Sequence, residues 1–247
     1  MAKHRMKCIR AGRLVREALW SASFPSDSPK ARAEKQKFSS AARQRLNDKA
    51  SWQKLKMILA ATFSHKDLVI TLGYDDAHHP STRDEARKKV KAFLTALRAD
   101  RKAHGRELMY VYNIEQFHGN KRFHHMIVVN GTGKDYALIR KLWKNGSDID
   151  IVPLDKWGYE ELAKYMTKEA REFGRGHVGD RTWVCSRNCK KPEVVPTEWV
   201  SGDVRLDPPP NAFVLQRESI QNEWGSFFYL EYMLPPEPKA KRCRPKS

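Results

Sequence analysis

The sequence predicts an α+β fold in which an antiparallel central sheet carries its helices mainly on one face, with a basic, partly helical N-terminal extension. Residues 108–130 contain two runs of β-branched and aromatic residues around a polar turn, which is typical of a β-hairpin. Other strand-like runs alternate with amphipathic helical segments. Hairpin-linked strands with helices between them favour an antiparallel sheet.

The charge of the chain indicates a polyanionic partner. The 247 residues include 47 Lys plus Arg and 29 Asp plus Glu, for a net charge of +18, and nucleic acid is the first candidate for such a protein. The apolar runs are too short to cross a membrane, and the N-terminus lacks the apolar core of a signal peptide. We therefore expect a cytoplasmic protein with no membrane partner, whose four cysteines are thiols.

The chain divides into three parts by composition. Residues 1–44 form the basic N-terminal extension, residues 45–200 the main domain, and residues 201–247 a C-terminal extension that ends in a basic tail. Because residues 1–30 are charged and contain few core residues, we expect the fold to survive their deletion.

The helices and strands of the main domain follow from periodicity and from turn and cap residues. We expect a helix at about 30–61, a strand at 67–72, a helix at 83–104 capped by Ser81 or Thr82, a helix at about 134–143, a strand at 149–154 and a helix at 157–172. Beyond Gly174 the sequence loses regularity.

The hairpin has a predictable register. If Gly119-Asn120 supplies the two central turn residues, Glu115 lies opposite His124 and Asn113 opposite Met126. Side chains alternate between the faces of a strand, so one face is apolar and the other gathers these polar groups. A carboxylate and an imidazole would thus share the uncovered face as candidate metal ligands, although a histidine in a strand is more often structural.

Four blocks in this order resemble one family. They are DLVITLGYDD, IEQFHGNKRFHHMIVVNG, LDKWGYEELAKYMTKE and SRNCKKPE, which together cover roughly residues 45–195. They are similar to rolling-circle replication initiators of the HUH endonuclease superfamily, in particular the filamentous-phage-type replication-associated proteins of bacterial plasmids and phages.

The resemblance implies a palm-like fold, a divalent metal, Mg²⁺ or Mn²⁺, and a tyrosine that nicks single-stranded DNA at a replication origin. That tyrosine becomes linked to the 5′ phosphate, and the free 3′ hydroxyl primes replication. The matching residues are Tyr165 and Lys168 in Tyr165-Met166-Thr167-Lys168. Tyrosine has a free pKa of ~10, so a nearby cation is needed to favour the phenolate. Tyr159, which lacks a lysine at this offset, is interpreted as structural.

The metal motif departs from the family pattern at one position. Met126 stands where the second ligand histidine is expected, and a thioether does not suit a hard cation. Three interpretations stay open: His125 turns inward through a strand irregularity, the site uses Glu115, His124 and His118, or the metal is bound weakly.

The resemblance also implies partners and alternatives. Arg122, Lys121 and Lys164 are expected to contact DNA, and a host helicase and polymerase are further expected partners in a bacterial cell. The leading hypothesis is a metal-dependent nickase and strand transferase. The alternatives are a DNA-binding module of the same fold with weakened catalysis, and a transposase or relaxase-type nickase with the same tyrosine chemistry.

Overall fold

The computed structural model describes residues 3–21, 40–116, 122–155, 157–169, 181–201, 205–222 and 225–236. The chain separates into two compact units. Residues 33–191 form the helix-rich unit, and residues 1–32 together with 192–247 form the strand unit. Both units are built on antiparallel sheets, and the α+β class predicted from the sequence is confirmed.

The helix-rich unit is organised around a five-stranded sheet with the strand order β6-β3-β5-β4-β7. Its strands are β3 (Leu68–Leu72), β4 (Tyr110–Gln116), β5 (Phe123–Val129), β6 (Ile149–Pro153) and β7 (Val184–Cys185). The helices are α2 (Ser40–Thr62), α3 (Arg83–Ala103), α4 (Asp135–Leu142) and α5 (Tyr159–Met166), with a short 3₁₀ turn η1 (Asp76–His78) after β3. The helices and the strands β3 to β6 match segments expected from the sequence, whereas η1 and β7 were not expected.

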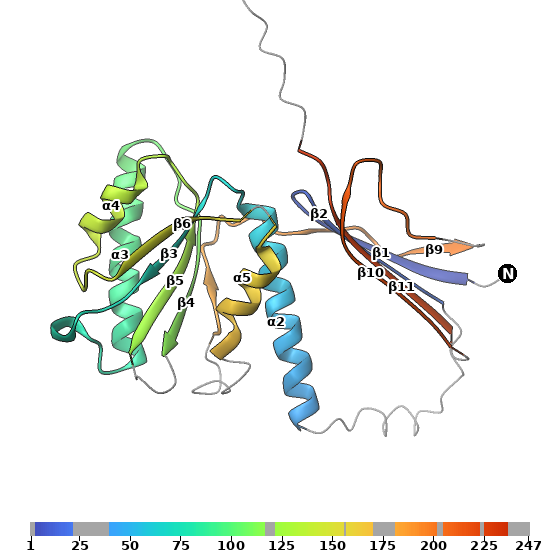
Figure 1. The fold of residues 1–247 in the computed structure, drawn as a ribbon, viewed down its shortest axis with the longest axis horizontal. Helices are drawn as coiled ribbons and strands as arrows, with labels where there is room; N and C mark the ends of the chain where they lie inside the picture. Colours follow the sequence, from blue (N-terminus) through green and yellow to red (C-terminus); the bar gives the residue numbers. More distant parts are fainter. Residues whose placement is uncertain are drawn as a thin grey trace, which may run out of the picture. The chain divides into compact units, whose positions relative to one another are not determined.

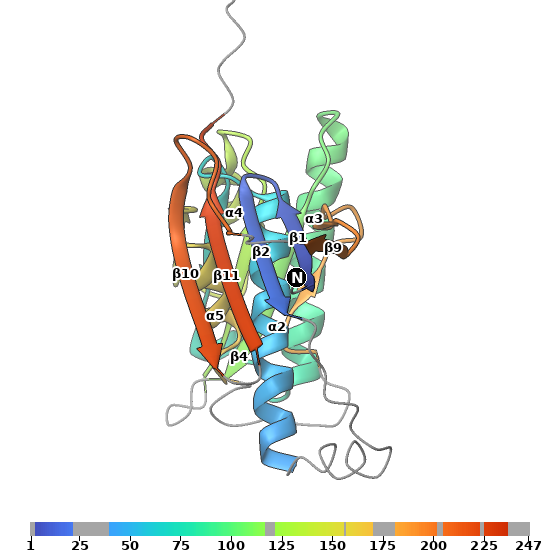
Figure 2. The same ribbon diagram turned by 90° about the vertical axis from the view of Figure 1, so that its right-hand side faces the viewer.

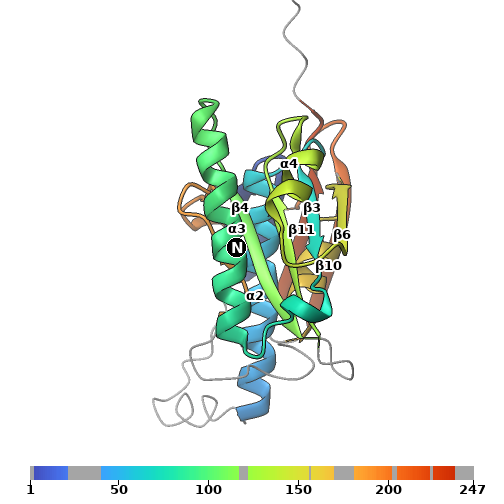
Figure 3. The same ribbon diagram turned by 90° about the vertical axis from the view of Figure 1, so that its left-hand side faces the viewer.

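The helices divide between the two faces of this sheet. α3 and α4 cover one face, and α5 with α2 lies on the other (Figures 1 and 3). The expectation of helices mainly on one face is corrected on this point. The reason is that the central strands are apolar on both sides, since Val69, Val111 and Val128 on the α5 side are buried, as are Ile70 and Ile127 on the α3 side.

Helix α3 shows how local sequence fixes an element of this unit. The Thr82 hydroxyl accepts a hydrogen bond from the Glu85 backbone amide at 3.2 Å and caps the helix. Val90, Phe93 and Leu97 form the stripe that packs on the sheet. Cap and stripe together place the cationic side chains of the first turns at the edge of β4.

The predicted hairpin register is confirmed. β4 pairs with β5 so that Glu115 lies opposite His124 and Asn113 opposite Met126, with no register shift along the ladder. The Gly119-Asn120 turn lies outside the described residues. The β3–β5 ladder is equally regular, so neither neighbour of β5 shows the irregularity that would turn His125 inward.

The strand unit is a six-stranded sheet that the sequence did not predict (Figure 2). Its order is β10-β11-β2-β1-β8, and β9 also pairs with β1. The strands are β1 (Lys3–Ala11), β2 (Leu14–Ser21), β8 (Glu193–Val194), β9 (Glu198–Ser201), β10 (Phe213–Asn222) and β11 (Gly225–Met233). The two expected extensions therefore contribute strands to one sheet.

This sheet also revises the expectation that residues 1–30 are dispensable for folding. Leu14, Val15 and Leu19 are at most 2% exposed, and β2 pairs with β11 over seven residue pairs. Removing both N-terminal strands would leave β11 without its neighbour and expose Leu230 and its apolar contacts. We now expect the deletion to unfold the strand unit.

Among the described helices, none is both long and apolar enough to cross a membrane.

Candidate active site

Helix α5 carries the candidate nucleophile and is anchored to α2. The Tyr159 hydroxyl donates a hydrogen bond to the Phe63 carbonyl at 2.8 Å. The Glu160 carboxylate pairs with the buried Lys56 ammonium at 2.5 Å. Tyr159 is 8% exposed, so its hydroxyl has a structural partner and little access to a substrate. The geometry agrees with the structural interpretation of this residue.

Tyr165 lies on the opposite, accessible side of α5. Its side chain is 43% exposed and lines an open groove of about 670 Å³ together with Lys164 and Lys168. The floor of the groove comes from β3, β5 and β6, and includes Met126. The structure thus brings Tyr165, Lys168 and the position of the missing motif histidine to one surface.

Asn113 links α5 to the hairpin, a role that no local pattern in the sequence indicates. Its side-chain amide is 2% exposed and donates hydrogen bonds to the Glu115 carboxylate at 2.7 Å and to the Met166 carbonyl at 2.8 Å. The Glu169 carboxylate accepts a third hydrogen bond from the Gln116 backbone amide at 2.9 Å. These bonds hold the end of α5 against β4, so they set the position of Tyr165 relative to Glu115.

The electrostatics around Tyr165 keep it protonated. Burial raises the pKa of the Tyr165 phenol, and the negative charge of Glu115 raises it further. Burial also raises the pKa of Glu115, while the Asn113 hydrogen bond and the charges of Arg83 and Lys168 lower it. A phenolate at this position needs additional positive charge between Tyr165 and Glu115.

The residues of the hairpin fit a hard divalent cation in part. Glu115 and His124 are directly opposed on the α5 side of the sheet, and a carboxylate with an imidazole suits Mg²⁺ or Mn²⁺ better than the thioether of Met126 does. The buried Asn113 Oδ1 has no hydrogen-bond partner among the described residues, so an oxygen donor is also present. Within the same residues, no three His, Cys, Asp or Glu side chains group closely enough to hold a metal.

His125 does not join these groups. It is fully buried on the α3 side of the sheet, where its Nε2 lies 2.5 Å from the Tyr74 hydroxyl and its ring packs edge-on against Trp143. Burial lowers the pKa of His125 to about 3. The strand alternation that makes His124 accessible directs His125 into the core, so its assignment as a metal ligand does not fit this geometry. His118 lies outside the described residues.

The expected DNA contacts are placed differently from one another. Lys164 lines the groove, but its ammonium pairs with Glu160 at 2.7 Å and Glu161 at 3.4 Å. Arg122 is half exposed and forms an ion pair with Asp76. Lys121 lies outside the described residues.

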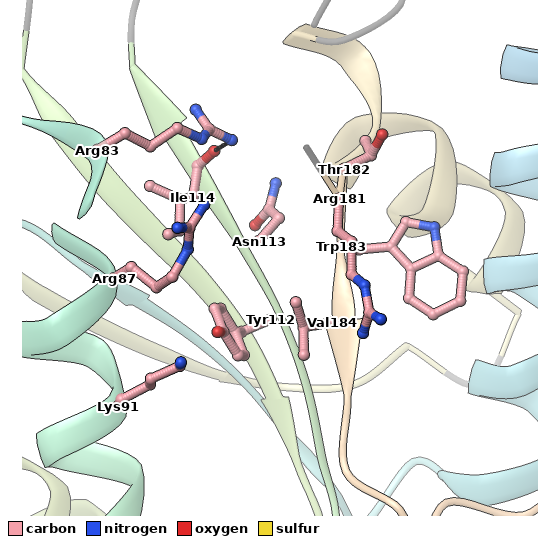
Figure 4. A pocket seen from close by; sticks show the side chains of 10 residues that line it. All are labelled: Arg83, Arg87, Lys91, Tyr112, Asn113, Ile114, Arg181, Thr182, Trp183 and Val184. Atoms are coloured by element: carbon pink, nitrogen blue, oxygen red, sulfur yellow. Dashed lines mark hydrogen bonds between the residues drawn. The ribbon is translucent and has the colours of Figure 1, made fainter. Parts of the chain in front are cut away.

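A second concave site was not expected from the sequence. A pocket of about 340 Å³ lies between the start of α3 and residues 181–184, beside β4 (Figure 4). Its walls carry the cations Arg83, Arg87, Lys91 and Arg181 and no carboxylate. Figure 4 shows the first three projecting from α3 on one side of Tyr112, with Arg181 on the other side. We call this the cationic pocket.

Arg83 connects the cationic pocket to the candidate active site. Its guanidinium donates a hydrogen bond to the Ile114 carbonyl at 2.8 Å and lies 3.9 Å from the Glu169 carboxylate. Arg83 therefore contacts the strand that carries Glu115 and the segment that follows Tyr165. The pocket can accept phosphate groups from a chain that passes over this end of β4.

Comparison with known proteins gives a match to one family model. No curated protein and no solved structure matches significantly. The model of the replication-associated protein family ORF2/gene II protein matches residues 67–170, which include every candidate site residue from Glu115 to Lys168 but less than half of the chain. The match supports a place for the helix-rich unit among replication-associated proteins and a role in the initiation of DNA replication.

Proposed function

We propose that this protein initiates rolling-circle replication by nicking and rejoining single-stranded DNA at an origin, with Tyr165 as the nucleophile. The observation that carries the proposal is the position of Tyr165. It is accessible on α5, shares a groove with Lys168, and lies near the Glu115 carboxylate, which is paired across the hairpin with His124.

The reaction is a transesterification. The Tyr165 oxygen attacks the phosphorus, the bond from phosphorus to the 3′ oxygen breaks, and a 5′ phosphotyrosine forms. The phenol loses one proton and the departing 3′ oxygen gains one, so no oxidant or energy source is consumed. The resulting 3′ hydroxyl primes a host polymerase after a host helicase separates the strands, and reversal of the same step rejoins the ends.

The residues around Tyr165 divide the remaining tasks. Lys168 balances the charge of the phosphate under attack, and Asn113 keeps α5 aligned with the hairpin. Glu115 and His124 would hold a divalent cation, which supplies polarisation of the phosphoryl oxygen and lowers the pKa of the nearby phenol when bound. Such a charge offsets the effect of Glu115 on Tyr165.

The DNA strand is bound mainly through its backbone. The cationic pocket places four positive side chains beside the strand that carries Glu115, and the whole chain carries a net charge of +18. Affinity for single-stranded DNA should therefore fall steeply as salt is added, by about 0.7 in log-log slope per phosphate contact.

A DNA-binding module with weakened catalysis is the alternative. Met126 in the groove and His125 in the core favour it, because together they leave His124 as the one described motif histidine on the α5 side. A transposase or relaxase-type nickase would share the Tyr165 site and differ in its biological setting.

Formation of a covalent adduct separates these functions. The protein is incubated with Mn²⁺ and single-stranded DNA carrying the element's origin, and the adduct is resolved by denaturing electrophoresis. Wild type and Tyr159→Phe should form the adduct, and Tyr165→Phe should not, while all three bind DNA. Absence of any adduct with normal binding would favour the weakened module.

A further inference from the structure

One face of the six-stranded sheet carries a row of large side chains that crosses five strands. Paired residues of adjacent strands point to the same face. The register pairs Arg5 with Trp199 and with Trp20, and it pairs Phe227 with Trp20 and with Ile220. These five residues therefore form one line from β9 to β10 along the strand order seen in Figure 2, about 19 Å long at a strand spacing of about 4.8 Å. We call this line the aromatic row.

The aromatic row is accessible over much of its length. Trp199 is 57% exposed, Ile220 52% and Phe227 36%, and Arg5 is also exposed. The Arg5 guanidinium lies 4.8 Å from the centre of the Trp199 ring, a stacked arrangement that leaves the other face of each group for a ligand. Exposed rings aligned in this way provide a platform for flat ligands such as nucleobases.

The charge of the sheet favours nucleic acid over an apolar protein partner. The β1 sequence KHRMKCIRA contains four Lys and Arg residues and no acidic residue. Lys7 is exposed two residues from Arg5, on the same face by strand alternation. On the same face Glu218 is exposed at the β10 side, paired with Tyr229. The positive end of the row is thus at β9 and β1, where a phosphate backbone would lie.

We propose that the aromatic row is a second binding site for single-stranded DNA, separate from the Tyr165 groove. Bases stack on Trp199, Trp20 and Phe227, and Arg5 and Lys7 contact the backbone. The site lies outside residues 67–170, the segment matched by the replication-associated family. The proposal rests on the proposed function only in its choice of DNA strand, because the platform needs no nucleophile.

Equilibrium binding of a fluorescent oligonucleotide tests the aromatic row. All measurements use the full chain in a Tyr165→Phe background, so that covalent capture contributes nothing. Loss of one stacked base weakens binding by between about 5-fold and about 150-fold, and we expect Trp199→Ala to fall in this range. Trp199→Phe keeps a ring and should retain most of the affinity. Phe213, which is 56% exposed on β10 outside the row, provides the matched control Phe213→Ala.

An abasic oligonucleotide of the same length isolates the stacking. It keeps the phosphates but has no bases, so Trp199→Ala should leave its binding unchanged. An equal loss with both oligonucleotides, or no loss with either, would overturn the proposal. A dimer in sedimentation that Trp199→Ala dissociates without any effect on DNA would instead assign the row to self-association. None of these outcomes depends on whether wild type forms an adduct.

Discussion

Replacing Asn113 with alanine tests how the fold positions the nucleophile. The substitution removes the hydrogen bonds to Glu115 at 2.7 Å and to the Met166 carbonyl at 2.8 Å. A hydrogen bond to a charged group contributes about 1.5 to 3 kcal/mol and a neutral one about 0.5 to 1.5 kcal/mol. Because Asn113 is 2% exposed, water does not replace either bond, and we expect the free energy of unfolding to fall by about 2 to 4 kcal/mol.

The assay combines urea unfolding with the rate of adduct formation. Asn113→Ala should slow the adduct by more than about tenfold because α5 loses its connection to β4. Asn188 is the matched control, since its side-chain amide also donates to a carboxylate, Glu107, and to a carbonyl, that of Leu108, but at an exposed position. Asn188→Ala should cost less than about 1 kcal/mol. Equal effects of the two variants would refute the argument from burial.

Three further predictions concern the cationic pocket and the hairpin. Lys91→Glu should weaken binding of single-stranded DNA and reduce the log-log salt slope by about 0.7, whereas Lys88→Glu, on the same helix but outside the pocket, should do much less. Since the fold lowers the pKa of His125 from 6.5 to about 3, the unfolded chain binds this proton first, and stability should fall by about 2 kcal/mol between about pH 7 and about pH 5; urea titrations should show this loss diminished in His125→Asn. Calorimetric titration should show tighter Mn²⁺ binding in Met126→His and weaker binding in His124→Ala; unchanged binding in both would remove the hairpin from the metal site.

Local sequence predicted the helix-rich unit because its signals are short in range. The turn and the alternation of the hairpin determined the pairing of Glu115 with His124, which the structure reproduces. The cap at Thr82 and the stripe from Val90 to Leu97 determined α3. Each of these signals depends on residues that lie close to one another in sequence.

The strand unit could not be predicted in this way. β2 pairs with β11, which follows it by roughly two hundred residues in sequence, and no local pattern specifies such a partner. The β1 segment KHRMKCIRA is basic at many positions, so its alternation is hidden by its charge. A charged segment of this kind is usually a solvated surface, and here the same charge accompanies a strand.

The candidate site was predicted in its chemistry but not in its supports. Tyr165 and Lys168 came from a motif, yet the role of Asn113 depends on a carbonyl 53 residues away in sequence. The cationic pocket requires residues 181–184 to lie beside α3, a proximity that only the tertiary fold creates. Sequence identified the candidate reactive groups, and packing between distant segments determined what surrounds them.

The most direct test of the account is to locate the DNA-linked residue by mass spectrometry. After the adduct is digested with nuclease and trypsin, Tyr165 falls in the peptide Tyr165–Lys168 and Tyr159 in the peptide Trp157–Lys164. We predict that the nucleotide is attached to Tyr165 within its short peptide. A nucleotide on the peptide that contains Tyr159, or on any residue other than Tyr165, would contradict the proposed mechanism.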